Sequence, residues 1–576
     1  MFNLFYYKPK NRDFLKNLEE TVTNSQNYVP IYQTFFDLNE SNYNSISFNH
    51  RNHVVDLDKI YDCSADKTIT QHVFIKYSPV LDPIHYMMGK YDIRDPRIQN
   101  LPQLNSTEET CFPKLLDTNN SSYVDGFFTF LSSVLLQYHG FFHGVDYYGS
   151  FMGIQREFKI NVVEDLEHLD GSEFFHKHLN KLFSLDYPLE TSFFCDNSRN
   201  CKNRLLISDE NVELEFDDIA PAPASENIDL SFSPRIEDPP VENANVDVAD
   251  KELKIEYENQ KQCPDESVYD NDDSSSLNYT SDGDDMAIDD LDEDSALDED
   301  SNSNSDSDSN FSTIDDDETS NNSDVFASIY NFPVNMICME KCSGTLDSIM
   351  NSLAEHEWRS ALFQVIMILL VYQKAFYLTH NDLHTNNIMY VETTHKHIYY
   401  KFNGECYKVP TYGRIYKIID YGRAIYTFRG RLFCSDSFAF HGDAATQYNF
   451  PPYYNDKKPR IDPNYSFDLC RLGCSIYDFV FEDENTPPRT EFERIILEWC
   501  TDDNGKNVMY KKSGEERYMD FKLYKMIART VHNHTPDAQL KHAFFQPYHV
   551  LGVIDSAATA KGLYLNIDGI SCYVDE

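Results

Sequence analysis

The amino-acid sequence predicts an α+β protein with two lobes, a small β-rich N-terminal lobe and a larger, mainly helical C-terminal lobe. Three observations lead to this fold class. Aromatic and β-branched runs before residue 220 are typical of strands, a long acidic tract follows them, and apolar residues after the tract recur with helical spacing. We expect an N-terminal lobe with an extension over 1–220, an insert over 221–324, the last strand and a hinge over 325–340, and the C-terminal lobe over 341–576.

The N-terminal lobe is predicted from one strand, one helix and two hairpins. The run VFIKYSPV over 73–80 is rich in β-branched and aromatic residues, which favours a strand. Between Tyr123 and Tyr138 the apolar residues lie three and four positions apart, which predicts a helix with one apolar face. The segments 146–163 and 204–218 combine strand-forming residues with turn-forming ones, so each predicts a hairpin.

The insert over 221–324 is predicted to be disordered. Between Asp209 and Asp324 there are 39 acidic residues and four basic ones, and the rest is mostly Ser, Asn and Pro. Such a composition buries too little apolar surface to offset the entropy of ordering the chain. A solvated spacer inside the small lobe is the simplest interpretation. Because Ser is interspersed with acid over 301–310, a partner-binding or self-phosphorylated segment is the alternative.

The C-terminal half begins with a buried strand, FPVNMICME over 332–340, and Leu346 opens a mostly helical region. Apolar residues from Trp358 to Tyr372 recur at helical spacing and predict a long helix with a wide apolar face. Short apolar runs then predict strands over 388–392 and 415–419, and a further helix begins near Asp468.

Charge and composition exclude several classes of function. The formal net charge is −46, of which −35 belongs to the acidic tract, so the remainder carries only about −11. No basic tract offsets this charge, and we therefore expect no nucleic-acid partner. The longest mostly apolar run, from Ala361 to Tyr372, is too short to cross a bilayer and predicts a core helix rather than a membrane span.

Cysteine usage points to a reducing compartment. None of the 13 cysteines forms a Cys-x-x-Cys pair, and the first residues lack the small-residue cleavage site that follows the apolar stretch of a signal peptide. Cys195 and Cys201 have the spacing of half a metal site, but no matching Cys or His pair follows them. We therefore expect free thiols and a cytoplasmic location.

Two motifs carry the candidate chemistry. HNDLHTNN begins at His380, directly after the long helix, and contains Asp382 and Asn387 five residues apart. Phosphoryl transfer needs a carboxylate near the attacking hydroxyl and an oxygen ligand for Mg²⁺, and these two side chains supply both from one loop. The second motif, IIDYG, places Asp420 at the end of an apolar strand, as a second acidic metal ligand.

Together, HNDLHTNN and IIDYG resemble the catalytic-loop and Mg²⁺-binding motifs of the protein-kinase-like superfamily. They occur in the same order, with apolar strands after the first and before the second. The resemblance implies a bilobal protein-kinase-like fold that binds ATP and Mg²⁺. In that fold Asp382 would be the catalytic carboxylate, and Asn387 and Asp420 would hold the metal.

Two further segments extend the resemblance to the nucleotide-binding residues. VFIK, over 73–76, is similar to the Val-Ala-Ile-Lys strand of protein kinases, which implies that Lys76 holds the α- and β-phosphates. MEKCSGTLDSIM is similar to the hinge between kinase lobes. Met339 would then be the gatekeeper, and the Glu340 carbonyl and the Cys342 backbone would face adenine.

DLCRLG over 468–473 resembles the Asp-x-x-x-x-Gly segment that opens a large-lobe helix, which implies that Asp468 steadies the catalytic loop by hydrogen bonds. The sequence also departs from the family. No Gly-x-Gly-x-x-Gly precedes Lys76, because residues 56–71 read DLDKIYDCSADKTITQ. The helical acid that pairs with Lys76 is not obvious, and Asp125 and Glu109 are the candidates.

The catalytic loop itself departs from the commonest pattern at two positions. His384 stands where a Lys usually neutralises charge on the transferred phosphoryl group, so we expect a catalytic role for it in the protonated form. Asn381 replaces the usual Arg, so this loop has no cation for a phosphorylated activation segment. An additional polar and aromatic hairpin lies between Asn387 and Asp420, and the Ala-Pro-Glu signature is missing.

Three functions fit these motifs. A divergent serine/threonine-protein kinase is favoured, because the long segment from Asp420 to Asp468 resembles an activation segment with a platform for protein substrates. The loop sequence is also similar to that of aminoglycoside and choline kinases, and haspin-type protein kinases share its second His. A pseudokinase scaffold that binds partners through the acidic tract is the third. The overall pattern resembles protein kinases of giant DNA viruses, which implies the host cytoplasm or the virion as location.

Overall fold

The computed structural model describes residues 2–186, 325–481, 486–519, 521–551 and 562–575, and these belong to one compact unit that joins both sides of the gap at 187–324. Helices and strands are both plentiful, so the predicted α+β class is confirmed. The predicted hairpin over 204–218, the acidic insert over 221–324, and Cys195 with Cys201 lie outside the described residues.

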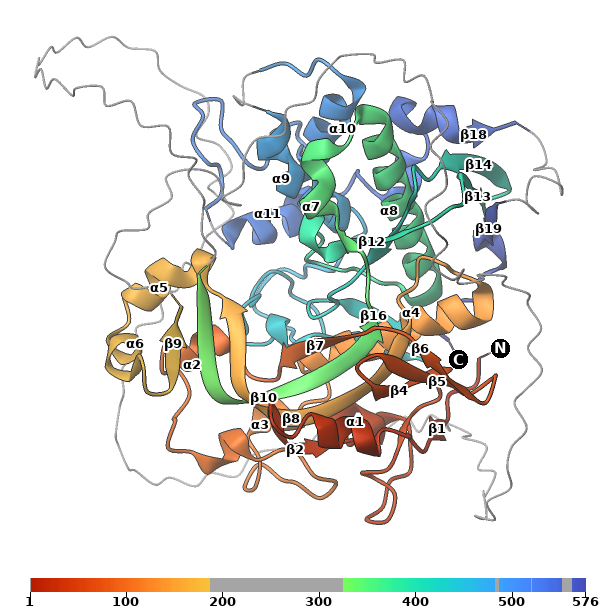
Figure 1. Cartoon of the computed structure of the whole chain (residues 1–576). Coiled ribbons are helices and arrows are strands. Elements are labelled where there is room, and N and C mark those ends of the chain that lie inside the picture. Colours follow the sequence, from red (N-terminus) through yellow and green to blue (C-terminus); the bar gives the residue numbers. More distant parts are fainter. Residues whose placement is uncertain (1, 187–324, 482–485, 520, 552–561, 576) are drawn as a thin grey trace, which may run out of the picture. The chain divides into compact units, whose positions relative to one another are not determined.

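A five-stranded sheet forms the N-terminal part of the described structure (Figure 1). Its order is β2-β8-β10-β7, with β9 also paired to β10. The strand predicted at 73–80 is β7, and the strand predicted at 332–340 is the second half of β10; these two pair antiparallel, with Ile337 opposite Lys76. The strands have these bounds: β2 Val22–Gln26, β7 Val73–Pro79, β8 Tyr147–Asn161, β9 Phe183–Leu185 and β10 Phe326–Glu340.

The hairpin predicted over 146–163 is wrong, because this segment is the single long strand β8. Its antiparallel partner is β10, which follows it only after the gap in the described chain. Gly153, within this strand, permits close approach of β2: a Cβ at this position would lie 2.3 Å from Cγ1 of Val22. Glycine here serves packing between strands rather than a reversal of the chain.

The helix predicted between Tyr123 and Tyr138 is confirmed as α4, Ser121–His139, which packs against β8 and β10. It begins where the Asn120 side chain accepts a hydrogen bond from the backbone N–H of Ser122. It ends at Gly140, whose left-handed conformation (φ +63°) suits a residue without a Cβ. Nearly all of its length is buried, so α4 is fixed between the sheet and the C-terminal part of the chain.

Short elements surround this sheet. Residues 52–70, which precede Lys76 and in which the sequence lacks a Gly-x-Gly-x-x-Gly, form a separate antiparallel sheet of β4, β5 and β6. The remaining elements have these bounds: β1 Tyr6–Tyr7, α1 Arg12–Asn17, β3 Ser47–Phe48, β4 Asn52–Asp56, β5 Lys59–Asp62, β6 Lys67–Thr70, α2 Pro83–Met87, α3 Pro113–Leu116, α5 Leu166–Asp170 and α6 Glu173–His178.

The long helix predicted around Trp358 is confirmed as α8, Glu355–Phe376. It is the one described helix whose length and apolar composition would suffice to cross a membrane, but 89% of its apolar window is buried in the structure. Its buried side chains extend round most of its circumference, which is typical of a helix at the centre of a core. This is the core helix that the sequence predicts.

The C-terminal part contains more β-structure than the mainly helical lobe that was predicted. The strands predicted at 388–392 and 415–419 are β12 and β15, and the additional hairpin is β13 and β14. Asn403 and Gly404, both with positive φ, make its tight turn. Strands from the end of the chain extend this hairpin to a four-stranded sheet, β18-β14-β13-β19, a pairing between distant segments that local patterns cannot reveal.

Helix α9, Phe467–Val480, begins beside the predicted Asp468. Its Gly473 faces α10, and a Cβ there would lie 2.9 Å from Cβ of Trp499, so close helix packing requires glycine. The other elements of this part have these bounds: β11 Gly344–Thr345, α7 Leu346–Ile349, β12 Ile388–Glu392, β13 His397–Phe402, β14 Glu405–Pro410, β15 Arg414–Ile418, β16 Ile425–Phe428, β17 Arg431–Cys434, α10 Glu491–Trp499, α11 Lys522–Thr530, α12 Pro536–Gln539, β18 His549–Val550 and β19 Leu563–Asn566.

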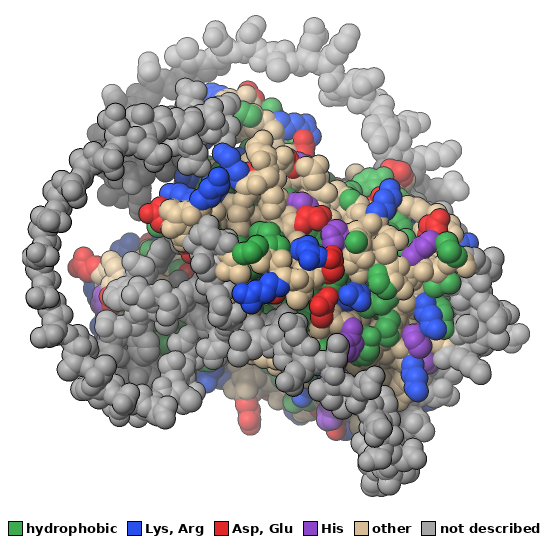
Figure 2. Space-filling model, turned by 90° about the horizontal axis from the view of Figure 1, so that it is seen from above, with side chains coloured by type: hydrophobic (Ala, Val, Ile, Leu, Met, Phe, Trp, Pro, Cys, Tyr) green, Lys and Arg blue, Asp and Glu red, His purple; other side chains and the backbone are tan. Residues whose placement is uncertain are grey.

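The described surface does not concentrate one sign of charge on the face seen from above. In Figure 2 basic, acidic and histidine side chains are interspersed over this face. This agrees with the modest net charge that remains once the acidic tract is set aside.

Candidate active site

The motif HNDLHTNN forms a loop whose backbone is hydrogen-bonded to the side chain of Asp468. The chain leaves α8 through Tyr377, which has a left-handed conformation, and reaches His380, the first residue of the loop, three residues later. The buried Asp468 carboxylate accepts hydrogen bonds from the backbone N–H groups of His380 (2.9 Å) and Asn381 (2.8 Å). The predicted steadying of this loop by Asp468 is therefore confirmed.

Asp382 lies at the tip of this loop and is held by groups from distant segments. The Tyr524 hydroxyl on α11 donates a hydrogen bond of 2.9 Å to Oδ1 of Asp382, and an Arg423 guanidinium nitrogen lies 3.6 Å from the same oxygen. Burial by itself would raise the pKa of Asp382, but Arg423 and other nearby cations outweigh it and lower the pKa well below its usual range. Asp382 is therefore an ionised carboxylate whose Oδ1 is held by Tyr524 and Arg423. Its Oδ2 can accept a hydrogen bond from a hydroxyl group.

Lys76 on β7 bridges two carboxylates from separate segments. Its ammonium lies 2.7 Å from Oδ2 of Asp125 on α4 and 2.7 Å from Oδ1 of Asp420, which follows β15. Of the two candidates for its partner, the structure pairs Lys76 with Asp125 on α4, while Glu109 lies in an exposed turn. Asp125 also accepts a hydrogen bond of 2.9 Å from the backbone N–H of Tyr421, so it holds the segment that carries Asp420 as well.

The electrostatics of this trio follow from burial and charge. Burial opposes the Lys76 ammonium, but Asp125 and Asp420 outweigh it and raise the pKa of Lys76. Burial and the neighbouring Asp420 raise the pKa of Asp125, whose side chain is only 1% exposed, although Lys76 opposes the shift. For Asp420, burial is outweighed by Lys76 and the pKa is lowered. The result is a charged lysine beside an ionised, partly exposed Asp420.

Asn387 is the last residue of the loop, and its side-chain amide holds the loop's shape. Its Nδ2 donates to the carbonyl of Asp382 at 3.0 Å and to Nε2 of His384 at 3.1 Å. The backbone carbonyl of Asn387 accepts a hydrogen bond of 3.0 Å from the backbone N–H of Ile419, which brings the loop beside Asp420. Asn387 and Asp420 therefore belong to adjoining backbone segments.

His384 is neutral in this structure. Burial lowers its pKa to about 4, and an Nε2 that accepts from the Asn387 amide carries no proton. The predicted positive charge on His384 thus stays a prediction for a state with phosphates nearby. The physical reason for the difference is desolvation, which sequence reasoning did not weigh.

The side-chain oxygens of Asn387 and Asp420 are suitable ligands for Mg²⁺. Oδ1 of Asn387 and Oδ2 of Asp420 make no hydrogen bond to the described residues, which leaves two hard oxygen ligands. Mg²⁺ is commonly bound by one or two carboxylates together with phosphate oxygens. Within the described ranges, no cluster of three or more His, Cys, Asp and Glu side chains is placed to hold a metal ion.

The predicted hinge residues lie at the end of β10. Met339 is buried and pairs with Phe74, while Glu340 pairs with Val73. The N–H of Cys342 makes no hydrogen bond to the part of the chain that the structure describes, as adenine recognition would require. The Glu340 side chain has an unpredicted role, because Oε1 accepts a hydrogen bond of 2.6 Å from the buried ammonium of Lys417.

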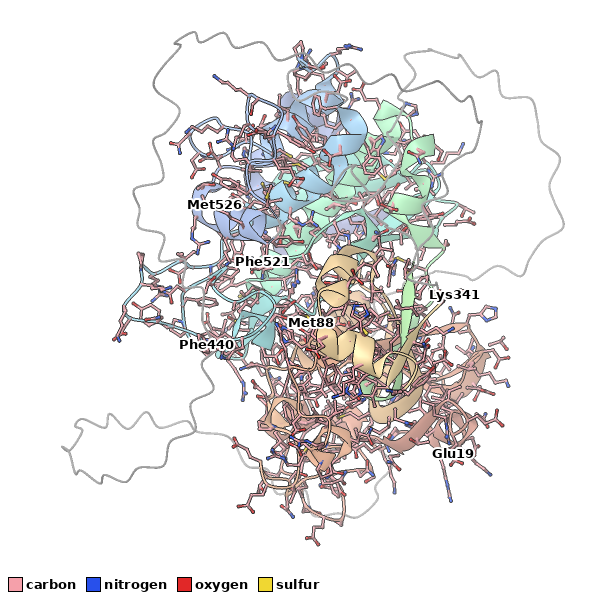
Figure 3. All side chains as sticks on the ribbon, turned by 90° about the vertical axis from the view of Figure 1, so that its left-hand side faces the viewer. Glu19, Met88, Lys341, Phe440, Phe521 and Met526 are labelled. Atoms are coloured by element: carbon pink, nitrogen blue, oxygen red, sulfur yellow. The ribbon has the colours of Figure 1, made fainter. Side chains whose placement is uncertain are left out.

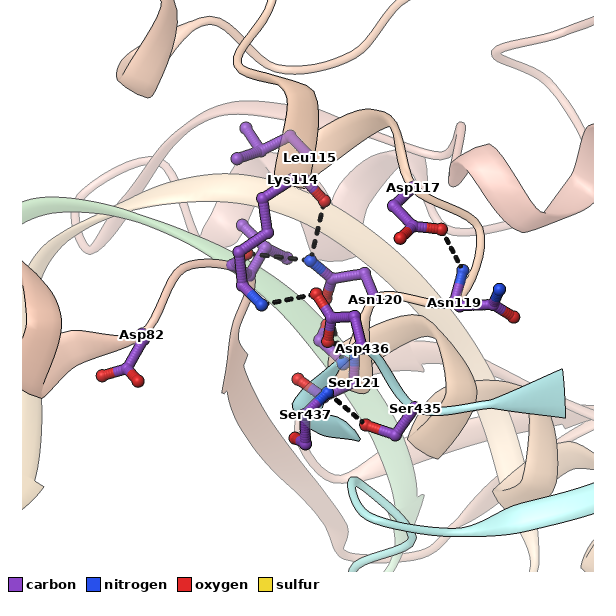
Figure 4. A network of polar contacts seen from close by, with 12 residues as sticks. Asp82, Lys114, Leu115, Asp117, Asn119, Asn120, Ser121, Ser435, Asp436 and Ser437 are labelled. Carbon is purple, nitrogen blue, oxygen red and sulfur yellow. Dashed lines mark hydrogen bonds and ion pairs between the residues drawn. The ribbon is translucent and has the colours of Figure 1, made fainter. Parts of the chain in front are cut away.

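The segment after Asp420 is anchored by two carboxylates. Arg423 forms an ion pair of 2.7 Å with Asp443. Asp436 accepts a hydrogen bond of 2.8 Å from the N–H of Ser121 at the start of α4 and forms an ion pair with Lys114 (Figure 4). Figure 4 shows these groups converging from α3, the α4 N-terminus and the segment after β17. A segment far along the chain is thereby tied to the helix that carries Asp125.

Sequence reasoning missed several residues that touch the candidate site. Tyr524 and Arg471 come from helices distant in sequence, and the Arg471 guanidinium donates a hydrogen bond of 2.7 Å to the Tyr524 hydroxyl. No local pattern marks them. Arg423, by contrast, directly follows the IIDYG motif, and its place next to this motif could have indicated a cation near the candidate site. Asn381 accepts a hydrogen bond from Tyr448 and donates one to the Arg423 carbonyl, so it positions Arg423.

The raised pKa of Asp146, which lies beside the predicted hinge, predicts that the stability of the folded chain depends on pH. Burial, together with the nearby Glu340, raises its pKa to about 6, despite hydrogen bonds from Asn52, Ser133 and Gln137. The folded state then binds this proton more tightly than the unfolded state, so the contribution of Asp146 to stability falls as pH rises through about 6.

Between pH 4 and pH 7, we expect the unfolding free energy of the wild type to fall by about 2 kcal/mol relative to that of Asp146→Asn. Only the wild type must ionise this group. Denaturant melts at both pH values measure it. The exposed Asp92→Asn provides a control whose difference should not follow this trend. A constant wild-type to Asp146→Asn difference would contradict the raised pKa.

A comparison with models of protein families finds no match. Among curated proteins, "Uncharacterized protein 098R" of Invertebrate iridescent virus 6 is similar, with 25% identity over 196 residues. The match covers 33% of this chain and 30% of that protein, so it spans less than a third of the viral relative. The similarity points to a viral relationship and assigns no chemistry.

Proposed function

We propose that this chain is a phosphotransferase with a bilobal protein-kinase-like fold, which transfers the γ-phosphoryl group of ATP to Ser or Thr hydroxyls of proteins. The observation that carries the proposal is the ion-paired bridge of Lys76 between Asp125 and Asp420, beside the loop that bears Asp382 and Asn387. These are the residue types, in the chain order, that such a reaction requires.

Each residue has a role in this proposal. Lys76 would hold the α- and β-phosphates, Asn387 and Asp420 would hold Mg²⁺, and the metal would neutralise charge on the phosphates. Asp382 would orient the acceptor hydroxyl and take its proton. Adenine would lie against the end of β10, at the backbone of Glu340 and Cys342 beside Met339.

Protein acceptors are favoured over small molecules by the segment from 421 to 466. Asp436 and Asp443 anchor this segment, and its Arg423 lies 3.6 Å from Asp382, which favours a fixed surface for a polypeptide acceptor beside that carboxylate. The similarity to a viral protein supports a viral source, with the host cytoplasm or the virion as location.

Purified protein incubated with labelled ATP and Mg²⁺ tests the proposal against mixed protein acceptors and, separately, against aminoglycosides and choline. Label in Ser or Thr of the protein acceptors is the expected result. Label in small alcohols alone would favour a small-molecule kinase. Nucleotide binding without turnover would favour a pseudokinase scaffold.

The Arg423–Asp443 ion pair predicts activity that is independent of phosphorylation. Because Asp443 already supplies negative charge to Arg423, treatment with a phosphatase should leave activity largely intact. Asp443→Asn should reduce kcat/KM by about two- to fivefold, since this pair is partly exposed and its energy is modest. The exposed Asp456→Asn, in the same segment, should have no effect. A large loss of activity after phosphatase treatment would contradict this role.

A further inference from the structure

A hollow of about 820 Å³ lies at the edge of the N-terminal sheet. Its walls come from the segment before α1, from α1 itself, from β2 and from Arg156 on β8. Figure 3 labels Glu19, a lining residue, at the outer edge of this sheet, far from Phe521 and Met526 near the catalytic loop. The hollow is therefore separate from the candidate active site.

The walls of the hollow carry four cations and one acid. Lys8, Arg12, Lys16 and Arg156 face one carboxylate, Glu19, which gives a local charge of about +3. None of the four cations forms an ion pair with any residue that the structure describes. Elsewhere on this chain exposed arginines such as Arg94 and Arg460 are paired. Four unpaired like charges around one hollow repel each other, and an anion between them would relieve that repulsion.

The neutral part of the lining also suits an oxyanion. The side chains of Asn24 and Ser25 line the hollow, and Asn11 and Asn27, whose Nδ2 groups already donate hydrogen bonds within the chain, each keep a second amide N–H. The Ser25 hydroxyl is buried and has no hydrogen-bond partner among the described residues.

The shape and chemistry of the hollow limit its ligand. Its volume lies within the ~300–1,000 Å³ of small-molecule sites. No aromatic side chain belongs to its lining, whereas sites for single-stranded nucleic acid stack bases on aromatic rings. Guanidinium groups bind phosphate in a bidentate manner, and Arg12 with Arg156 supplies two of them.

We propose that this hollow binds clustered phosphate groups on a compact ligand. The site is independent of the phosphotransferase chemistry. The ligand is either a free polyphosphorylated small molecule or a closely spaced pair of phosphorylated side chains of a protein. Both present the same chemistry to the four cations.

Titration calorimetry of the full chain with tripolyphosphate tests this site, with a doubly phosphorylated peptide and a single-stranded RNA as parallel probes. Binding should be saturable and should weaken as salt rises. Arg12→Gln combined with Arg156→Gln should weaken tripolyphosphate binding at least tenfold and leave the melting temperature unchanged, because both side chains are exposed.

Two control variants make the result specific. Lys59→Gln combined with Arg94→Gln changes the net charge by the same amount but lies outside the hollow, so binding should persist. Lys76→Met removes the candidate nucleotide lysine and should also leave this binding intact, which separates the two sites. Tighter binding of the phosphopeptide or of tripolyphosphate identifies the source. Equal loss in both double variants, or RNA binding tighter than either phosphate probe, would overturn the proposal.

Discussion

Asp382→Asn should lose most phosphoryl transfer, about 10²- to 10⁴-fold in kcat, while Mg·ATP binding changes by less than about twofold. The physical reason is that the Asp382 carboxylate is ionised and positioned by Tyr524 and Arg423, but makes no contact with the Lys76 bridge. An amide in the same place keeps the hydrogen bond to Tyr524 and cannot accept the acceptor's proton. Steady-state turnover and calorimetric nucleotide binding measure the two effects.

Asp420→Asn is the matched comparison for this experiment. Asp420 pairs with Lys76 and supplies a metal ligand in the proposal, so its loss should weaken Mg²⁺-dependent nucleotide binding rather than turnover alone. Wild-type turnover in both variants would refute the phosphotransferase proposal. Equal losses of binding and turnover in both would leave the activity in place and refute the separate roles.

Asp468→Ala should be among the most destabilising single changes in this chain. The buried Asp468 carboxylate accepts two backbone hydrogen bonds, and its removal leaves the N–H groups of His380 and Asn381 unpaired in the core. Each buried unsatisfied donor costs about 1–3 kcal/mol, which predicts a loss of about 2–5 kcal/mol in unfolding free energy. Activity should fall in parallel, because the same bonds hold the loop that carries Asp382.

Chemical denaturation and the melting temperature measure this loss. Asp462→Ala is the control: among the described residues Asp462 forms its ion pair with the exposed Arg460, and its removal should change stability by less than about 0.5 kcal/mol. Equal stability of Asp468→Ala and Asp462→Ala would contradict the structural role of Asp468.

Local patterns in the sequence predicted most single elements of the fold. The helices around Tyr123 and Trp358 and the strand at 73–79 were found because their apolar spacing depends only on neighbouring residues. The segment at 147–161 was mistaken for a hairpin, because its partner β10 is distant in sequence. The sheet formed by β13, β14, β18 and β19 was missed for the same reason.

In the candidate site, too, the residues within short motifs could be predicted from the sequence, and those from distant segments could not. Asp382, Asn387 and Asp420 stand in short motifs, so residue type and spacing alone nominate them. Tyr524 reaches Asp382 from 142 positions further along the chain, and no spacing rule connects the two.

The sequence by itself determined which side chains are candidates for chemistry, because motif residues occupy one loop and one strand end. The choice of Asp125 over Glu109 as the partner of Lys76 needed the tertiary structure, since it depends on how α4 packs against β8 and β10 and so brings Asp125 to Lys76 and to the backbone of Tyr421. The neutral state of His384 needed it too, because desolvation by the surrounding chain sets its pKa. The cations around the sheet-edge hollow come from segments more than 130 residues apart, and only folding brings Arg156 beside Arg12. Contacts, burial and charge neighbours are properties of the folded chain, and these decided how the nominated residues are arranged.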